Sequence, residues 1–313
     1  MSRKITIIGA GSVGATIAYT LSNDDIASEI VMIDINKQKA EGEVLDIIQG
    51  TCFREPISII AGDYEDAAGS DIVIITSGIA RKPGQTRLEL AQTNVNILKS
   101  IAPQIAKAAP DAKYIIVSNP VDVMTYVFTK VSGIPENQII GSGTVLDTAR
   151  LRCGISEHFG IAQKNVHAYI FGEHGDSSFV PWSLANIGSV PVEKYAAAFE
   201  GGNMPALDKD DVEDYIRKSG GIIIAAKKCT NYAIGVTTAT LCEALNYDTD
   251  SVLTISSMMN GEYGIDDVCL SIPSVVGAKG LTGHIVAPLT DAEIASLRHS
   301  ADCLKDVIKQ IQF

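Results

Sequence analysis

His174 and a carboxylate at an expected helix start are the side chains best placed for acid–base chemistry. His174 lies in the segment Phe171-Gly-Glu-His-Gly-Asp176, where glycines flank it just after an expected strand. A structural histidine usually lies inside a helix or strand, whereas proton transfer needs an imidazole that the substrate can reach. Asp147 and Arg150 are three residues apart and therefore share one helix face. Spacing alone favours an ordinary helix salt bridge for that pair, so these residues are candidates that do not yet define a reaction.

A glycine-rich turn near the N-terminus predicts a dinucleotide site. The segment Gly9-Ala-Gly11-Ser12-Val13-Gly14 directly follows an expected strand and opens an expected helix. The first glycine permits the tight bend, the second lets a pyrophosphate approach the backbone, and the third lets the helix pack on the strand. The amide groups at the helix start, around Ser12 and Val13, would face the phosphates.

Asp34 indicates which dinucleotide binds. It ends the second expected strand, twenty residues after Gly14. A carboxylate there accepts hydrogen bonds from the adenosine ribose and repels a 2′-phosphate, and the following Ile35 and Asn36 supply no arginine. We therefore expect NAD rather than NADP. The alternative is that the glycines mark a structural turn and that Asp34 is a solvated strand end.

Composition and charge exclude several classes of partner. The 313 residues include 25 Lys and Arg against 37 Asp and Glu, a formal net charge of -12. An acidic surface repels nucleic acid and anionic membranes. The apolar runs are short, no signal segment precedes the first strand, and the six cysteines are scattered without Cys-x-x-Cys spacing. We therefore expect a cytoplasmic enzyme with reduced cysteines, no metal site, no nucleic-acid partner and no membrane contact.

The order of expected elements predicts an α/β fold. Lys4 to Ile8, Glu29 to Ile33 and Ile57 to Ala61 are short apolar runs, and helical segments alternate with the strands. Asp71 to Thr76 and Tyr114 to Ser118 are nearly continuous β-branched runs, typical of strands buried on both faces of a parallel sheet. This alternation predicts right-handed crossovers and a doubly wound parallel sheet of the Rossmann type.

The second half of the chain differs in character. From about Val166 onward we expect shorter strands and longer helices, including one long helical stretch from Arg217 to Leu245. A capping box at Thr290-Asp-Ala-Glu293 predicts the start of a last helix. We therefore divide the chain into an NAD-binding Rossmann domain, residues 1–142, and an α+β catalytic and substrate domain, residues 143–313.

The sequence resembles the lactate/malate dehydrogenase family over essentially its whole length. The matching motifs are GAGSVG (9–14), SNPVD (118–122), GTVLDTARLR (143–152) and GEHGD (172–176). The resemblance implies hydride transfer between NAD and an L-2-hydroxy acid, with His174 as proton donor and acceptor and Asp147 holding its imidazole. It implies that Arg150 grips the substrate carboxylate with a bidentate fork. Asn119 would line the site beside the nicotinamide, and Thr230 resembles a substrate-pocket threonine of the lactate branch.

The resemblance makes the segment from Ser77 to Arg87 a lid over the substrate, and the alternative is a solvated basic loop. Arg87 matches the family arginine that polarises the substrate carbonyl. Arg81 matches the position that contacts the far end of the substrate, where lactate dehydrogenases carry glutamine and malate dehydrogenases carry arginine. An arginine facing a methyl group in a closed site would be unsatisfied, at a cost of roughly 1–3 kcal/mol or more. We therefore predict interconversion of (S)-malate and oxaloacetate in preference to lactate and pyruvate.

Other features favour the lactate branch. The LDTARLR motif, the surroundings of GEHGD and the C-terminal half are closer to bacterial L-lactate dehydrogenases, and Gln85 fits neither branch. An L-lactate dehydrogenase or a dual-substrate enzyme is therefore the alternative. That likeness also implies a homotetramer, with a dimer as the alternative. It implies a fructose 1,6-bisphosphate site at a subunit interface, formed by Arg152 and His167, and the alternative is that this pair is structural.

Two rival functions explain less of the sequence. NAD-dependent glycosidases hold a metal with Cys and His, and we expect no such ligand set here. A non-catalytic NAD sensor would keep the glycine turn but need not keep His174, Asp147, Arg87 and Arg150 together. We therefore expect an enzyme.

Overall fold

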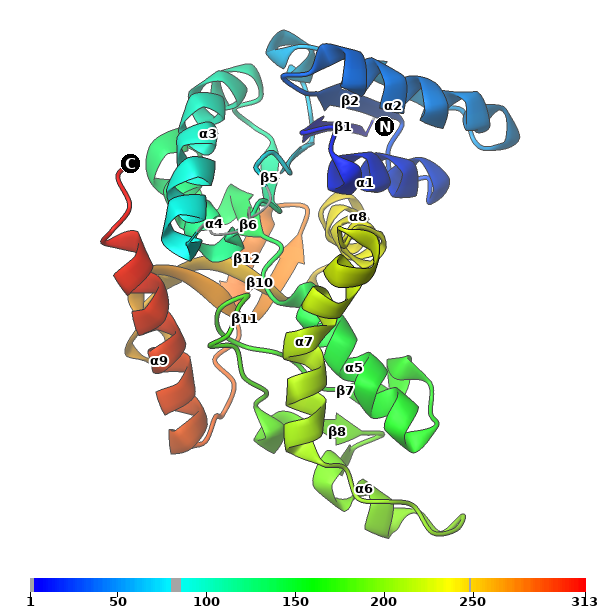
Figure 1. The fold of residues 1–313 in the computed structure, drawn as a ribbon, viewed down its shortest axis with the longest axis vertical. Coiled ribbons are helices and arrows are strands. Elements are labelled where there is room, and N and C mark those ends of the chain that lie inside the picture. Colours follow the sequence, from blue (N-terminus) through cyan, green and yellow to red (C-terminus); the bar gives the residue numbers. More distant parts are fainter. Residues whose placement is uncertain (1–2, 80–85, 248) are drawn as a thin grey trace.

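A nine-stranded sheet forms the centre of the chain. The computed structural model describes residues 3–79, 86–247 and 249–313, and Figure 1 shows their arrangement. In this described part the strand order is β12-β11-β10-β6-β5-β4-β1-β2-β3. The parallel strands are β1 (Lys4–Ile8), β2 (Glu29–Ile33), β3 (Ser58–Ala61), β4 (Ile72–Ile75), β5 (Lys113–Ile116) and β6 (Ile139–Gly141).

The order of the parallel strands reverses direction between β1 and β4. From β1 the chain proceeds outward to β2 and β3, and it then returns to place β4, β5 and β6 on the other side. This is the doubly wound Rossmann arrangement that the sequence predicts, and ligands of such sheets bind beyond the carboxyl ends of the strands at the switch point. The expected strands at Lys4–Ile8 and Glu29–Ile33 are confirmed.

Helices cover both faces of the parallel sheet. In β2, Ile30 and Met32 pack in a hydrophobic cluster with α1, α2 and α8, whereas Val31 and Ile33 pack in a second cluster with α3, α4 and α9. Both faces are buried, so the strands need no polar alternation. The helices of these two layers are α1 (Ser12–Asn23), α2 (Lys37–Gly50), α3 (Arg87–Ala108), α4 (Val121–Ser132), α8 (Tyr232–Tyr247) and α9 (Asp291–Ile308).

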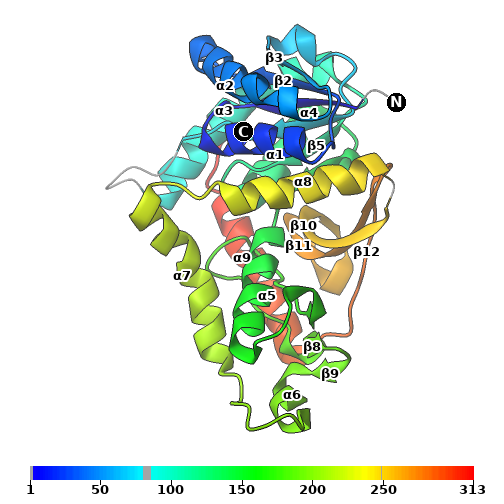
Figure 2. The same ribbon diagram turned by 90° about the vertical axis from the view of Figure 1, so that its right-hand side faces the viewer.

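Antiparallel strands extend the same sheet beyond β6. They are β10 (Ser251–Asn260), β11 (Asp266–Gly277) and β12 (Gly280–His284), and β10 meets β6 where Ser256 pairs with Gly141. The remaining elements form the lower lobe in Figure 2. They are α5 (Val145–Phe159), β7 (Val166–His167), β8 (Asn186–Ile187), β9 (Val190–Pro191), α6 (Val192–Ala198) and α7 (Lys209–Lys227).

Short 3-10 turns link several of these elements. They are η1 (Thr51–Phe53), η2 (Tyr64–Ala67), η3 (Glu136–Gln138), η4 (Gln163–Asn165), η5 (Trp182–Leu184) and η6 (Glu262–Gly264). No helix in the described ranges has the length and apolar character needed to cross a bilayer.

Two expectations for the second half are wrong. β10 and β11 have 10 and 12 residues, longer than any strand of the first half. The helical stretch expected from Arg217 to Leu245 is two helices, because Lys228 ends α7 with a left-handed backbone (φ 74°). The expected capping box is confirmed, since Thr290 caps α9 and Glu293 completes the box.

Candidate active site

Two side chains, those of Asp122 and Ser300, fix the backbone of the loop that carries His174. The backbone N–H of His174 donates to Asp122 Oδ2 at 2.8 Å, and the N–H of Glu173 donates to Ser300 Oγ at 2.7 Å. Gly172 begins the loop with φ 92°, and a Cβ there would lie 2.7 Å from Ser300 Oγ. Glycine is therefore needed at this position both for its backbone conformation and for its close approach to α9.

His174, Asp147 and Arg150 form one connected group. His174 Nδ1 lies 2.5 Å from Asp147 Oδ2, and Arg150 Nη1 donates to Asp147 Oδ1 at 2.8 Å. The carboxylate can only accept, so Nδ1 carries a proton and donates it. The first turns of α5 supply Asp147 and Arg150 together, which makes the pair a helix salt bridge and a partner of the histidine at once. Sequence spacing offers those two interpretations as alternatives, and the geometry combines them.

Charge and burial shift the protonation of this group. The Asp147 carboxylate raises the pKa of His174 to about 9 through its charge, opposed by burial and helped by the hydrogen bond. Burial alone would raise the pKa of Asp147, but the adjacent imidazole and the Arg150 guanidinium outweigh it and hold that pKa below its usual value. His174 is therefore poised to carry a proton at neutral pH, as a proton donor to a carbonyl requires.

His174 lines a cavity of about 550 Å³, and because Asp147 occupies Nδ1, Nε2 is the ring nitrogen available to this space. Within the described ranges, Nε2 has no hydrogen-bond partner. Side chains from α3, the loop before α4, the His174 loop and α9 surround this space. They include Arg87, Asn119, His174, Asp176, His299 and Cys303. The cavity therefore brings the candidate proton donor together with an arginine and an amide.

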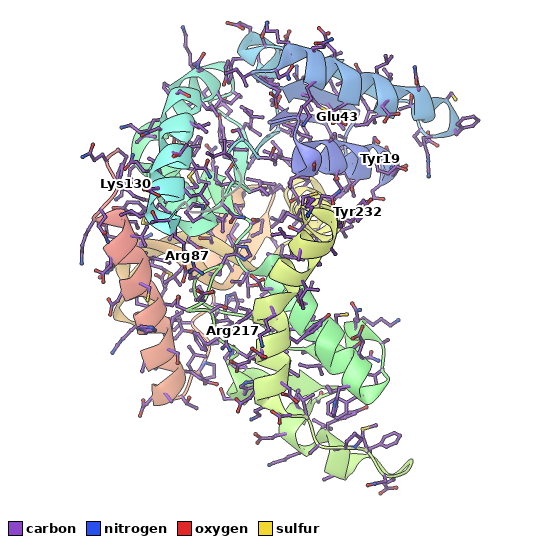
Figure 3. All side chains as sticks on the ribbon, viewed as in Figure 1. Tyr19, Glu43, Arg87, Lys130, Arg217 and Tyr232 are labelled. Carbon is purple, nitrogen blue, oxygen red and sulfur yellow. The ribbon has the colours of Figure 1, made fainter. Side chains whose placement is uncertain are left out.

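Arg87 is the first residue of α3 and projects at the end of that helix that lies beside α9 (Figure 3). Its Nη2 lies 2.6 Å from Asp176 Oδ2, and both side chains are largely exposed, at 69% and 74%. An exposed ion pair of this kind is worth about 0–1 kcal/mol. Arg87 is therefore free to exchange Asp176 for a substrate oxygen.

Neither Arg150 nor Thr230 is among the described residues that line this cavity. Arg150 is nevertheless linked to it through Asp147 and His174. The second guanidinium nitrogen of Arg150, Nη2, faces α7, where a Cβ on Gly220 would lie 3.7 Å from it. Thr230 is half-buried in the short link between α7 and α8. Arg81 lies outside the described residues.

The glycine turn fits a dinucleotide. Gly9 has φ 109°, and a Cβ there would lie 2.6 Å from Thr76 Oγ1, so the bend admits only glycine. A Cβ on Gly14 would lie 1.9 Å from the carbonyl oxygen of Gly9, so this glycine lets α1 pack against the turn. Nothing lies within 4 Å of a Cβ position on Gly11, which leaves its side open to a phosphate.

The polar groups around the turn also fit NAD. α1 starts at Ser12, and in the described part of the chain neither Ser12 nor Val13 gives its backbone N–H to a protein acceptor. Asp34 Oδ2 accepts from Ala10 N–H at 2.7 Å and Oδ1 accepts from Asn36 N–H at 2.8 Å. These bonds fix the carboxylate at the end of β2, beside a small cavity between the start of α2 and the end of β3. The helix start can receive a pyrophosphate, and Asp34 can receive ribose hydroxyls.

Arg152 and His167 lie on neighbouring elements of the lower lobe, α5 and β7. Arg152 Nε donates to the carbonyl of Ala168 at 3.2 Å, and its guanidinium lies over the Tyr169 ring at 4.9 Å. His167 is exposed at the end of β7. The contact with Ala168, the residue after His167, therefore brings Arg152 close to the segment that carries His167.

Three features of the site do not follow from the sequence motifs. Asp122 was noted only as the last residue of SNPVD, although it holds the His174 loop. Asp176 was noted only as part of GEHGD, although it pairs with Arg87. His299 Nε2 lies 3.7 Å from Cys303 Sγ at the cavity wall, one helical turn apart on α9. Of these three, only the His299–Cys303 contact could have been found from the sequence, because residues four apart lie on the same helix face.

Two family profiles together match nearly the whole chain. The profile described as lactate/malate dehydrogenase, NAD binding domain, matches residues 3–141, and the profile described as lactate/malate dehydrogenase, alpha/beta C-terminal domain, matches residues 144–312. The NAD-binding profile covers the glycine turn and Asp34, so the expected cofactor, NAD, is confirmed.

Known proteins of similar sequence and structure are named lactate dehydrogenases. L-lactate dehydrogenase 1 of Clostridium acetobutylicum is 46% identical over 311 residues, covering 98% of each chain. L-lactate dehydrogenase of a Thermoanaerobacter species is also 46% identical, covering 98% of this chain and 99% of the relative. The crystal structure of the minor L-lactate dehydrogenase of Enterococcus mundtii superposes with a TM-score of 0.94 at 37% identity, covering 100% of this chain and 99% of that one.

Proposed function

Because this chain belongs to the lactate/malate dehydrogenase family, and is thus an NAD-dependent 2-hydroxy-acid dehydrogenase, we propose that it reduces pyruvate to L-lactate. The observation that carries the chemistry is the His174 imidazole, whose Nδ1 is fixed to Asp147 while Nε2 is available to the cavity that His174 lines. The full-length similarity to L-lactate dehydrogenases supports pyruvate as the substrate. This similarity favours pyruvate and L-lactate, the alternative substrates predicted from the sequence, over the main prediction of oxaloacetate and malate.

Each side chain has a defined part in this reaction. Bound NADH supplies the hydride that reduces the carbonyl carbon of the 2-oxo acid. His174 Nε2 gives its proton to the carbonyl oxygen, and Asp147 stabilises the imidazolium before that transfer. Arg150 binds the carboxylate, and Arg87 leaves Asp176 to stabilise the negative charge that develops on the oxygen. Asn119 borders the same space, beside the nicotinamide. Thr230 contributes to the substrate pocket, as the resemblance to the lactate branch implies.

A second candidate substrate, oxaloacetate, rests on Arg81 alone. Arginine at this position would pair with the second carboxylate of a dicarboxylic acid, and pyruvate offers that guanidinium no partner. Such an enzyme would interconvert (S)-malate and oxaloacetate, or would accept both substrates. Neutral Gln85, in the same segment, adds no repulsion toward a dianion.

The deciding experiment compares kcat/KM for pyruvate and oxaloacetate with purified enzyme and NADH. A pyruvate preference of tenfold or more, about 1.4 kcal/mol, supports L-lactate dehydrogenase, and the reverse ratio supports malate dehydrogenase. Arg81→Gln isolates the second candidate, because it should lower kcat/KM for oxaloacetate at least tenfold and leave pyruvate unharmed. An unchanged ratio in this variant would remove Arg81 as a specificity residue. Lys82→Gln, at the next position, is the matched control for loss of a positive charge.

We also propose that Arg152 and His167 bind fructose 1,6-bisphosphate across a subunit interface of a homotetramer, with a dimer as the alternative. The hydrogen bond that joins Arg152 to the segment carrying the exposed His167 supports the site. Exposed aromatic side chains such as Tyr19 of α1 and Tyr232 of α8 (Figure 3) support a subunit interface over those two helices. Light scattering gives the oligomeric state. A substrate saturation curve that fructose 1,6-bisphosphate leaves unchanged, in the wild type and in Arg152→Gln alike, would exclude the effector site.

We further propose the division into residues 1–142 and 143–313. The ranges matched by the two family profiles support it. Two unfolding transitions in differential scanning calorimetry would agree with it. A single transition would favour one cooperative unit.

A further inference from the structure

We propose that Asp122 is a positioning residue for proton transfer, whose buried carboxylate fixes the backbone of His174 and places a second negative charge beside the imidazole. This inference rests on the proposed role of His174 as acid and base. It concerns a group that the mechanism above does not use, since Asp122 contacts neither the cavity nor the substrate-binding arginines. His174 would then have two carboxylate partners, Asp147 at its imidazole ring and Asp122 at its backbone N–H.

The contacts of Asp122 tie the active-site loop to the central sheet. Asp122 lies in the first turn of α4 and is 2% exposed. Its Oδ2 accepts the backbone N–H of His174 at 2.8 Å, and its Oδ1 accepts the hydroxyl of Ser256 in β10 at 2.6 Å. Ser256 stands opposite Gly141 of β6, where the parallel and antiparallel parts of the sheet join. The carboxylate therefore anchors the loop to the central sheet at that junction.

The Asp122 carboxylate accepts from two neutral donors, the His174 N–H and the Ser256 hydroxyl. Among the described residues, no Lys or Arg forms a salt bridge with it. Burial of an unpaired carboxylate is unfavourable, and a neutral side chain of the same shape would avoid that cost. Asparagine would fit, because its oxygen can accept from His174 N–H while its amide donates to the Ser256 hydroxyl. The two hydrogen bonds therefore explain why a side chain of this shape occupies the position. They do not explain why it carries a negative charge, because asparagine could make them too.

The charge acts on the imidazole of His174. After Asp147, the Asp122 carboxylate is the next negative charge that raises the pKa of His174, while Arg150 opposes it. Burial raises the pKa of Asp122 itself to about 6, and its two hydrogen bonds oppose that rise. Glu173 of the loop also raises the pKa of Asp122 through its charge. Cys269 of β11 stays a neutral thiol, because burial and the charge of Asp122 both raise its pKa. Asp122 is therefore ionised at neutral pH and favours the protonated form of His174.

The test is Asp122→Asn, which keeps the shape and removes the charge. The KM for the 2-oxo acid is measured against pH at saturating NADH, and the His174 ring is titrated by NMR in the absence of substrate. We expect the midpoint of both curves to fall by at least about half a unit, which raises KM about threefold at pH 9.5. An unmoved midpoint together with lower thermal stability would reduce Asp122 to a structural role and overturn the proposal.

Two further variants complete the test. Ser300→Ala is the matched control, because it loosens the same loop at Glu173 without removing a charge, and its midpoint should stay at the wild-type pH. If Asp122→Asn does not fold, Ser256→Ala decides, since it frees one oxygen of the carboxylate. A kcat lowered several-fold at unchanged KM for NADH supports the positioning role, and a wild-type kcat overturns it. The NMR titration needs no turnover, so it separates failure of this inference from failure of the proposed function.

Discussion

Two histidine–carboxylate pairs in this molecule have nearly the same geometry and different surroundings. His174 Nδ1 lies 2.5 Å from Asp147, and His284 Nδ1 lies 2.7 Å from Glu262. The second pair continues to Ser257, whose hydroxyl lies 2.8 Å from His284 Nε2. A serine, a histidine and a carboxylate in this order match the connectivity of a hydrolase triad.

The difference lies in the second ring nitrogen. His284 Nε2 accepts the Ser257 hydroxyl within the sheet, and Ser257 is 1% exposed, so no substrate can reach the serine. His174 Nε2 is instead available to the cavity that His174 lines together with Arg87 and Asn119. A carboxylate-bound histidine is thus a structural bridge when both nitrogens are used internally. It becomes a proton donor when one nitrogen faces a space that a substrate can enter.

The largest expected effect separates the two histidines. His174→Gln should lower kcat by about 10²–10⁴, because it removes the general acid and base, while NADH binding persists. His284→Gln should leave kcat within about twofold and reduce the free energy of unfolding by about 1–3 kcal/mol, the cost of unsatisfied buried groups. Steady-state kinetics and denaturant unfolding of both variants provide the measurement. Equal losses of kcat would show that the contrast drawn from Nε2 is wrong.

The contact between His174 and Asp147 could be predicted from the sequence, but the contact between His284 and Glu262 could not. His174 and Asp147 are 27 residues apart in recognisable motifs, and the family resemblance supplies their contact. Glu262, Ser257 and His284 meet only because β10, η6 and β12 fold against one another, and the sequence analysis expected short strands in that region. Pairing of antiparallel strands depends on register, which side-chain patterns specify weakly when both faces are buried.

The same limit applies to Asp122. Its motif was recognised, but its partner Ser256 is 134 residues away on a strand whose junction with β6 the sequence does not reveal. The Rossmann half was predictable because local periodicity and glycine placement determine its elements. Contacts that cross from the parallel to the antiparallel part of the sheet are determined by packing alone.

A smaller effect is expected from Asp147, and it appears in the pH dependence. Protonated His174 binds the carbonyl oxygen, so KM for the 2-oxo acid should be flat below the raised pKa of about 9 and should then rise about tenfold per pH unit. Asp147→Asn removes the main cause of that raised pKa, so the rise should begin at lower pH. The pH profile of KM for both proteins is the measurement. An identical onset in the variant would contradict the assigned role of Asp147.

The smallest effect is expected at Glu262. The pKa of this carboxyl is held below its usual 4.5, because its hydrogen bonds to His284 and to the N–H of Asn260 outweigh the opposing effect of burial. A carboxylate with a depressed folded-state pKa stabilises the protein above its unfolded pKa, and that stabilisation is lost as pH falls through the folded value. Glu262→Gln should therefore reduce the free energy of unfolding by about 0.5–1.5 kcal/mol at pH 7 and progressively less below about pH 4, without changing kcat. Denaturant unfolding across this pH range provides the measurement. The matched control is Glu293→Gln, because Glu293 is a helix-capping carboxylate whose pKa is also lowered but which has no histidine partner. If Glu262→Gln moved the onset of the KM rise to lower pH, as Asp147→Asn is expected to do, the second pair would belong to the active site.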